Sequence, residues 1–410
     1  MWLSASSDER RDHFVVIGNP GSRRVELFQA ALAELRLPAA RVVSYLDLLS
    51  GKDALPRSVR DGTVVRIESP GKDFEVERAL IAAGAGATDG DERFDRVSRQ
   101  AAQDLRFERG RILYPRQWYL GYCATLRLIE LQLAECPPHR SLPRPHPQWM
   151  NSPAEIALMF DKVACHQALR SRGAHVAPGL GAVNSFDELV GRMREQNCHR
   201  VFVKLASGSS ASGVVAYQTD GRRHQATTTV ETARQNGELR LYNSRRIRVY
   251  RDRREIAELI DALCRNRVHV EQWLPKAGFA NRTFDLRVVV IAGRACHAVA
   301  RLSRSPMTNL HLLNERGDAD AVREKVGRAA WAAAMRNCEL AMECFPESLY
   351  AGIDLLFTPD FRRQAVIEVN AFGDLLPGVF WQGQETYAAE LRAMAGARAC
   401  QRARDFCKGA

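Results

Sequence analysis

The sequence lacks several features that would assign it to a well-defined class of protein. Its ten cysteines include no C-x-x-C pair and no Cys/His spacing typical of zinc, so we expect reduced thiols and no structural zinc site. No apolar run approaches the roughly 18 residues that span a bilayer, and charged residues precede the first apolar segment, unlike in a signal peptide. The patterns G-x-G-x-x-G and G-x-x-x-x-G-K-[ST] are also absent. These absences predict a cytoplasmic protein without a membrane span and without the two common nucleotide motifs.

Lysine is scarce, with seven residues in the chain, although the formal net charge is +11. Arginine supplies the excess charge, and it is spread along the sequence apart from the stretch 243–255 (NSRRIRVYRDRRE) and the C-terminus. A solvated basic face is therefore favoured over nucleic-acid binding. An anionic substrate or a nucleotide would suit the same charge. Because lysine is rare, a lysine inside a predicted strand is a candidate functional residue.

The order of predicted elements indicates an α/β fold with several domains. A chain of 410 residues with 46% hydrophobic and 26% charged content is long enough for two or three cores. Strand, turn and helix follow one another twice near the N-terminus, which predicts a small open α/β domain over 1–105. The segment 106–150 is irregular and contains several prolines, so we assign it as a linker or substrate segment. Two α+β units over 151–275 and 276–390, and a helical tail over 391–410, complete the predicted organisation.

Two long helices are predicted after the linker. The first covers 153–172, with Ser152 and Glu155 as a capping box and Gly173 as its end. The second is amphipathic and covers about 320–343.

A predicted hairpin near the C-terminus carries three polar side chains on one face. Asp354 lies in the apolar strand AGIDLLF, and Glu368 and Asn370 lie two residues apart in the strand QAVIEVN. If the strands pair, the two carboxylates oppose each other and require a cation between them. Three oxygen ligands without sulfur or imidazole suit Mg²⁺. A hairpin with one polar face in water explains these residues equally well when they are taken alone.

Lys204 ends an apolar strand and precedes a loop of small residues. The loop offers backbone N–H groups and hydroxyls to phosphate oxygens, with the lysine as a neighbouring point charge. By itself the loop is better explained as a flexible Gly/Ser connection. Together with the paired carboxylates, it favours a site for a phosphate group and a metal ion. The loop residues concerned are Ser207, Gly208, Ser209, Ser210 and Gly213.

Further polar residues follow in strands that the sequence predicts downstream. Glu271 ends the strand VEQWL, whose last residues could present backbone groups and apolar side chains to an adenine ring. Trp273 in that strand is more typical of a core position. Asp285 and Arg287 share one strand face, and Arg301 with Asn309 extends the polar set. Each of these alone would fit a cross-strand ion pair of little energetic weight.

Taken in order, these motifs resemble the ATP-grasp superfamily of carboxylate–amine ligases. The resemblance covers roughly 150–385, and the first α/β unit resembles the Rossmann-like domain that precedes ATP-grasp in such ligases. The segments RIESPGKDFEVERAL and PRQWYLGY resemble the sequences of an uncharacterised bacterial ATP-grasp group of unknown substrate. The resemblance implies two α+β subdomains that clasp ATP, with ATP and Mg²⁺ as cofactors.

The resemblance also implies roles for individual residues. Phosphate contacts fall to Lys162, Lys204 and the loop residues Ser207, Gly208, Ser209, Ser210 and Gly213. The adenine and ribose contacts fall to Glu271, Gln272, Trp273 and Leu274. The transferring phosphoryl group or the acyl phosphate would be stabilised by Arg287, Arg301 and Asn309. The metal ligands would be Asp354, Glu368 and Asn370.

The implied reaction is formation of an amide bond driven by ATP. A substrate carboxylate would attack the γ-phosphoryl group, and an amine would displace phosphate from the resulting acyl phosphate, with release of ADP. A kinase on the same fold and a non-catalytic ATP-binding module are the alternatives. Expected partners are small-molecule or peptide carboxylates and amines, without nucleic acid or membrane, and a homodimer is one oligomeric state to consider. Arg66, Glu68, Ser69, Arg116, Trp118 and Tyr119 are candidates for substrate selection, with surface or packing roles as the alternative.

Overall fold

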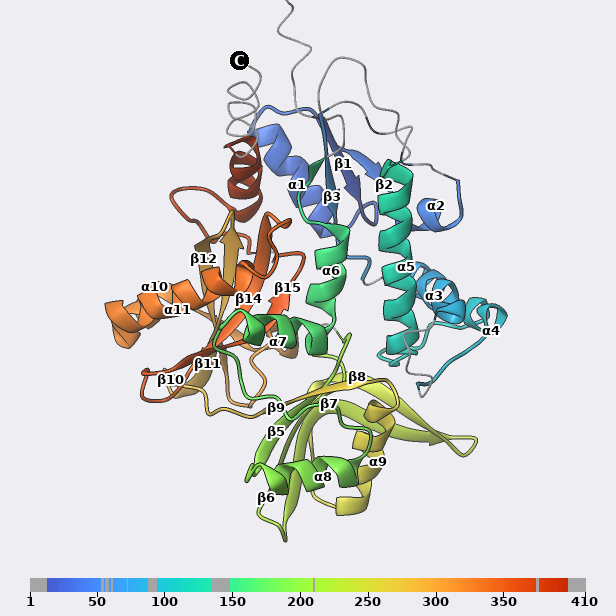
Figure 1. The fold of residues 1–410 in the computed structure, drawn as a ribbon, viewed down its shortest axis with the longest axis vertical. Helices are drawn as coiled ribbons and strands as arrows, with labels where there is room; N and C mark the ends of the chain where they lie inside the picture. The colour runs from blue at the N-terminus through green and yellow to red at the C-terminus, as the bar shows by residue number, and fades with distance from the viewer. Residues whose placement is uncertain are drawn as a thin grey trace, which may run out of the picture.

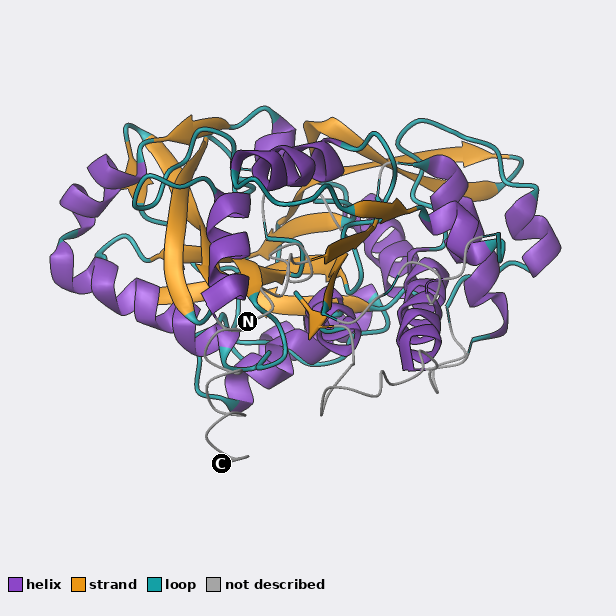
Figure 2. Cartoon of the chain, turned by 90° about the horizontal axis from the view of Figure 1, so that it is seen from above, coloured by secondary structure: helices purple, strands orange, loops and turns teal. Residues whose placement is uncertain are grey.

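The computed structural model describes residues 13–52, 55, 59, 62–71, 73–87, 94–134, 148–208, 211–373 and 376–396. Three β-sheets form its framework and succeed one another along the molecule (Figure 1). Figure 2 shows the chain from above, with helices at both ends and strands running between them. Within the described residues, no helix is both long enough and apolar enough to cross a membrane.

The first sheet is parallel and has the strand order β2-β1-β3-β4. Its strands are β1 (His13–Ile17), β2 (Arg41–Val43), β3 (Thr63–Ile67) and β4 (Gln148–Trp149). Its helices are α1 (Arg23–Glu34), α2 (Tyr45–Leu49), α3 (Phe74–Ala83), α4 (Arg99–Gln103) and α5 (Pro115–Ala134), with the 3₁₀ turn η2 (Gly84–Gly86) after α3. The strand–turn–helix order predicted for this region is confirmed.

The expectation of irregular structure over 106–150 is wrong for much of that segment. It contains the 20-residue helix α5, and β4 extends the first sheet beside β3. Helix α5 packs so closely on α3 that no side chain fits at Gly121. A Cβ atom at this position would lie 1.9 Å from the carbonyl oxygen of Leu80. The sequence gives no cap signal at the start of α5, and its aromatic residues obscure the apolar periodicity.

The predicted helix over 153–172 is two helices, α6 (Pro153–Phe160) and α7 (Lys162–Ser171). Asp161 interrupts them with a ψ of 98°, and its carboxylate caps α7 by accepting hydrogen bonds from the amides of Val163 and Ala164. The capping box at Ser152 does not form, because Glu155 accepts a hydrogen bond from the amide of Glu347 instead. The break makes Lys162 the first residue of α7.

The second sheet is antiparallel and has the order β8-β7-β6-β5-β9. Its strands are β5 (Arg200–Leu205), β6 (Val214–Thr219), β7 (His224–Gln235), β8 (Glu238–Tyr250) and β9 (Val268–Gln272). Helices α8 (Phe186–Glu195) and α9 (Arg253–Cys264) share a buried core with one face of this sheet. The long hairpin of β7 and β8 was not predicted, because its polar residues hide the alternation that marks a strand.

The third sheet has the order β13-β12-β11-β14-β15, with β10 (Gly278–Phe279) beside β11. The remaining strands are β11 (Arg282–Ile291), β12 (Arg294–Ser303), β13 (Glu315–Gly317), β14 (Tyr350–Phe357) and β15 (Gln364–Asn370). The two predicted hairpins are confirmed. The predicted helix over 320–343 is two helices, α10 (Ala319–Val326) and α11 (Arg328–Met342), because Gly327 has a φ of 90° that ends the first of them. The 3₁₀ turn η3 (Leu310–Leu312) follows β12.

A buried ion cluster joins the first sheet to the C-terminal helix over 386–396, which lies beside α1 (Figure 1). Arg66 of β3 has no exposed side-chain surface and contacts the carboxylates of Glu68 and Glu390, each at 2.7 Å. Its guanidinium carbon lies 4.7–4.8 Å from the ring centres of Phe28, Tyr350 and Tyr387. Arg66 and Glu68 therefore have structural roles, and the packing alternative for these two residues is the correct one.

We expect stability to depend on pH through Glu390. Burial raises its pKa from 4.5 to about 7, against the opposing charge of Arg66. Between these two pKa values the folded protein holds a proton that the unfolded chain releases, so stability falls as the pH rises from about 4.5 to 7. Glu390→Gln removes this dependence. Relative to the wild type, the variant should gain about 2–3 kcal/mol between pH 5 and pH 8 in urea unfolding. A constant difference across this range would contradict the expectation.

Candidate functional site

A cleft of about 700 Å³ lies where the second and third sheets face each other. Its walls come from β5, β6 and β9 on one side and from β11, β12, β14 and β15 on the other. Predicted site residues that line it are Lys162, Lys204, Gly208, Glu271, Gln272, Leu274, Arg301, Asn309, Asp354 and Glu368. Residues from six separate segments of the sequence thus converge in one place.

Lys204 and Glu271 form a buried ion pair on neighbouring strands β5 and β9. Burial opposes the charge of Glu271, but the ammonium group of Lys204 and the hydrogen bond with His269 outweigh it and lower the pKa of the carboxyl to about 2. The imidazole of His269 lies 3.2 Å from the second carboxylate oxygen. Lys204 is therefore held at the cleft wall as a fixed positive charge.

Lys162, in the first turn of α7, extends its side chain between the two walls of the cleft. Its backbone amide donates to the carbonyl of Ala206 at 2.8 Å, which ties α7 to the segment after β5. Its ammonium group donates to the carbonyl of Gly208 in the small-residue loop and lies 3.1 Å from a carboxylate oxygen of Glu368. One lysine thus joins the loop of the second sheet to the carboxylate of the third.

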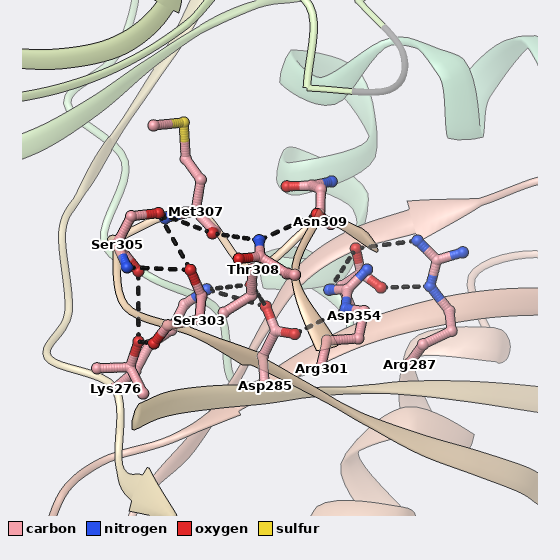
Figure 3. A network of polar contacts seen from close by, with 12 residues as sticks. Lys276, Asp285, Arg287, Arg301, Ser303, Ser305, Met307, Thr308, Asn309 and Asp354 are labelled. Carbon is pink, nitrogen blue, oxygen red and sulfur yellow. Dashed lines mark hydrogen bonds and ion pairs between the residues drawn. The ribbon is translucent and has the colours of Figure 1, made fainter. Parts of the chain in front are cut away.

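A chain of alternating charges runs along the wall of the cleft that β11, β12 and β14 form (Figure 3). Asp354 accepts from Arg287 and contacts Arg301 at 3.0 Å. Arg301 also donates to Asp285 at 2.7 Å. Burial opposes the charge of Asp285, but Arg301 and Lys276 outweigh it and hold its pKa well below the usual range. The carboxylate of Asp285 therefore balances charge on two buried cations, Arg301 and Lys276.

Asp354 and Glu368 face each other across β14 and β15, as the sequence predicted, and both line the cleft. Asn370 pairs with Gly352 farther along and donates its amide to that carbonyl at 3.1 Å. The described residues contain no cluster of three His, Cys, Asp or Glu side chains suited to a metal. Two opposed carboxylates with one carboxamide oxygen nevertheless fit a hard cation that completes its shell with phosphate and water. In this structure the two carboxylates are balanced by Lys162, Arg287 and Arg301.

Several predicted residues do not line the cleft. Ser207 is buried, and Gly213 follows the loop with a φ of 66°. Trp273 packs on Phe202 with ring centres 5.4 Å apart, which agrees with a core position. Arg287 contacts Asp354 of the cleft, and Asn370 donates to the carbonyl of Gly352, which does not line the cleft. Ser209 and Ser210 lie outside the described residues.

The sequence interpretation missed Lys276, Thr308 and the apolar walls of the cleft. Lys276 donates to Asp285 at 2.9 Å and to the hydroxyl of Thr308 at 2.6 Å, and burial lowers its pKa. The scarcity of lysine is a signal that could have identified it, because three of the seven lysines line this cleft. Apolar wall residues, including Phe202, Met307, Leu356 and Ile367, carry no comparable signal.

Comparison with known structures identifies the fold. No protein-family model matches the sequence, and no curated protein matches it. The D-cycloserine synthetase DcsG is similar, with a TM-score of 0.53 and 12% identity, over 94% of this chain and 99% of that one. The macrocyclase MdnC from Microcystis aeruginosa MRC, solved with its precursor peptide MdnA, has a TM-score of 0.50 and 12% identity, over 93% and 98%. The ATP-grasp ligase PsnB, solved with a precursor variant, Mg and ADP, has a TM-score of 0.47 and 17% identity, over 89% and 91%.

The chain therefore has the ATP-grasp fold, preceded by a Rossmann-like domain. The fold class predicted from the sequence is confirmed.

Proposed function

We propose that the protein is an ATP- and Mg²⁺-dependent ligase that joins a carboxylate to an amine with release of ADP. The observation that carries the proposal is the convergence of Lys162, Lys204 and Arg301 with the opposed pair Asp354 and Glu368 in one cleft. Fixed cations beside two opposed carboxylates suit a nucleoside triphosphate and its metal ion. A synthetase and a macrocyclase share the fold, which supports a synthetic reaction.

The side chains of the chain supply charge and position in this proposal, and none acts as a nucleophile. Lys162 and Lys204 bind phosphate oxygens from the two walls, while the apolar side chains of Phe202 and Leu356 cover the base. Arg301 stabilises negative charge on the phosphoryl group as the substrate carboxylate attacks it, and Asn309 lines the same cleft beside it. A metal held by Asp354, Glu368 and Asn370 would neutralise further phosphate charge.

The direct test is release of ADP in the presence of candidate carboxylates and amines. We expect release only when both are supplied with Mg²⁺, and we expect hydroxylamine to replace the amine and give a hydroxamate. A kinase would instead form a stable phosphorylated product without a hydroxamate. A non-catalytic module would bind a non-hydrolysable ATP analogue and release no ADP with any pair of an amino-acid and dipeptide panel.

Nucleotide binding tests the role of Lys204. Replacing this lysine alone would leave Glu271 buried without its main partner, so the double variant Lys204→Met/Glu271→Gln removes both charges together. We expect the Kd for the ATP analogue, measured by calorimetry, to rise roughly 10- to 100-fold, because a charge-assisted contact is lost. Lys325→Met, which removes an exposed lysine of α10, is the matched control. Equal affinity in the two variants would disprove the assigned role.

A further inference from the structure

Strand β8 has an irregular stretch at the outer edge of the second sheet. Val230 pairs with Asn243 and Thr228 pairs with Arg248, so the four residues 244–247 oppose Thr229 alone. Such bulges turn side chains away from the regular ladder and are common beside functional sites. We call residues 244–247 the arginine bulge.

The bulge carries two positive charges that no carboxylate of the described residues balances. Arg245 and Arg246 are exposed, and within the described part of the chain neither forms an ion pair. Their neighbours differ in this respect, since Arg248 pairs with Glu231 and Arg253 pairs with Asp187. Of the basic stretch identified in the sequence, Arg248 and Arg253 are paired, whereas the two arginines of the bulge, like Arg251 and Arg254, have no ion pair within the described residues.

The bulge lies at the rim of the cleft. Thr229, which it opposes, donates its hydroxyl to the carbonyl of Ala211 at 2.9 Å, and Ala211 lines the cleft. Ala211 packs with Met307 and Leu312, and η3, to which Leu312 belongs, contacts β8. Ala211, which follows the small-residue loop, thus lies with η3 and β8 at one edge of the site.

The same edge of β8 already pairs with an extended segment. Ile112 donates its amide to the carbonyl of Leu241 at 2.9 Å, and Asn243 donates to the carbonyl of Gly110 at 2.6 Å. The residues that follow along this edge are those of the bulge. An extended peptide could therefore continue the pairing into the rim of the cleft, as in β-strand addition.

We infer that the arginine bulge binds an acidic, extended peptide. We also infer that such peptides are the substrate class of the enzyme, and this second step rests on the proposed ligase function. Two unpaired guanidinium groups match carboxylate side chains, and the strand edge matches a peptide backbone. Single-stranded nucleic acid fits less well, because it uses stacked aromatic rings, whereas the exposed side chains beside the arginines are Ile247 and Val249.

Binding of a fluorescent hexaglutamate peptide to the full chain tests the inference without turnover, so its result is independent of ligase activity. Anisotropy should show binding that weakens with salt, and hexaglutamine should not bind. Arg245→Ala/Arg246→Ala should weaken hexaglutamate binding roughly five- to tenfold, because two exposed charge contacts are lost. The control Arg234→Ala/Arg253→Ala removes the same charge from paired arginines and should change binding less than twofold.

Three results would overturn the inference. Equal weakening by both double variants would show that net charge alone attracts the peptide. Absence of hexaglutamate binding to the wild type would remove the proposed partner. Tighter, bulge-dependent binding of a single-stranded oligonucleotide would assign the bulge to nucleic acid instead of an acidic peptide.

Discussion

Glu368→Gln should reduce Mg²⁺-dependent release of ADP roughly a thousandfold, because it removes one of the two opposed carboxylates proposed to hold the metal. Glutamine keeps the shape of the side chain, which is 24% exposed, so the melting temperature should change little. Turnover is measured by coupled ADP detection, and folding is checked by circular dichroism. Glu343→Gln, at an exposed ion pair with Arg172, is the control.

The same variant has a second signature that a structural role would not produce. In the structure Glu368 holds Lys162 at 3.1 Å, so metal-free nucleotide must compete with this carboxylate for the lysine. Glu368→Gln frees Lys162, and binding of the ATP analogue without Mg²⁺ should become tighter than in the wild type. Retained turnover would disprove the metal assignment, and weaker metal-free binding would disprove the competition.

Asp285→Ala should destabilise the protein by roughly 3–5 kcal/mol, because it leaves Lys276 without its carboxylate and Arg301 with only Asp354. Both cations are buried, so water cannot replace the lost partner. We expect the melting temperature to fall by roughly 5–15 °C, measured by scanning fluorimetry.

Two further variants make this stability prediction specific. Asp285→Asn keeps hydrogen-bond acceptance and should destabilise less than alanine. Arg234→Ala breaks an exposed ion pair with Glu258 and should shift the melting temperature by only about 1 °C. A shift of that size for Asp285→Ala would show that the charge chain contributes little to folding.

The fold and most of the cleft could be predicted from the sequence where local signals are strong. The alternation of side chains along two strands predicts the hairpin in which Asp354 and Glu368 oppose each other. The position of Lys204 between a strand and a small-residue loop predicts its place at the site. Helix breaks were missed where one residue overrides a periodic pattern. Asp161 and Gly327 are such residues, because a side-chain cap or a positive φ acts locally and leaves the apolar spacing intact.

The sequence by itself determined the opposed carboxylates and Lys204, because strand alternation and residue type are local properties, whereas the class of fold and the role of Lys162 came from the resemblance of the ordered motifs to a known family. Only the tertiary structure decided that Lys162 contacts Glu368, that Lys276 and Asp285 belong to the charge chain, and that Arg66 is a core residue. It also decided that, among the residues that the structure describes, Arg245 and Arg246 of a long basic stretch have no ion pair and lie on a bulge at the rim of the cleft. These facts depend on contacts between residues far apart in the chain, and burial at such contacts decides which charges are neutralised and which remain available to a ligand.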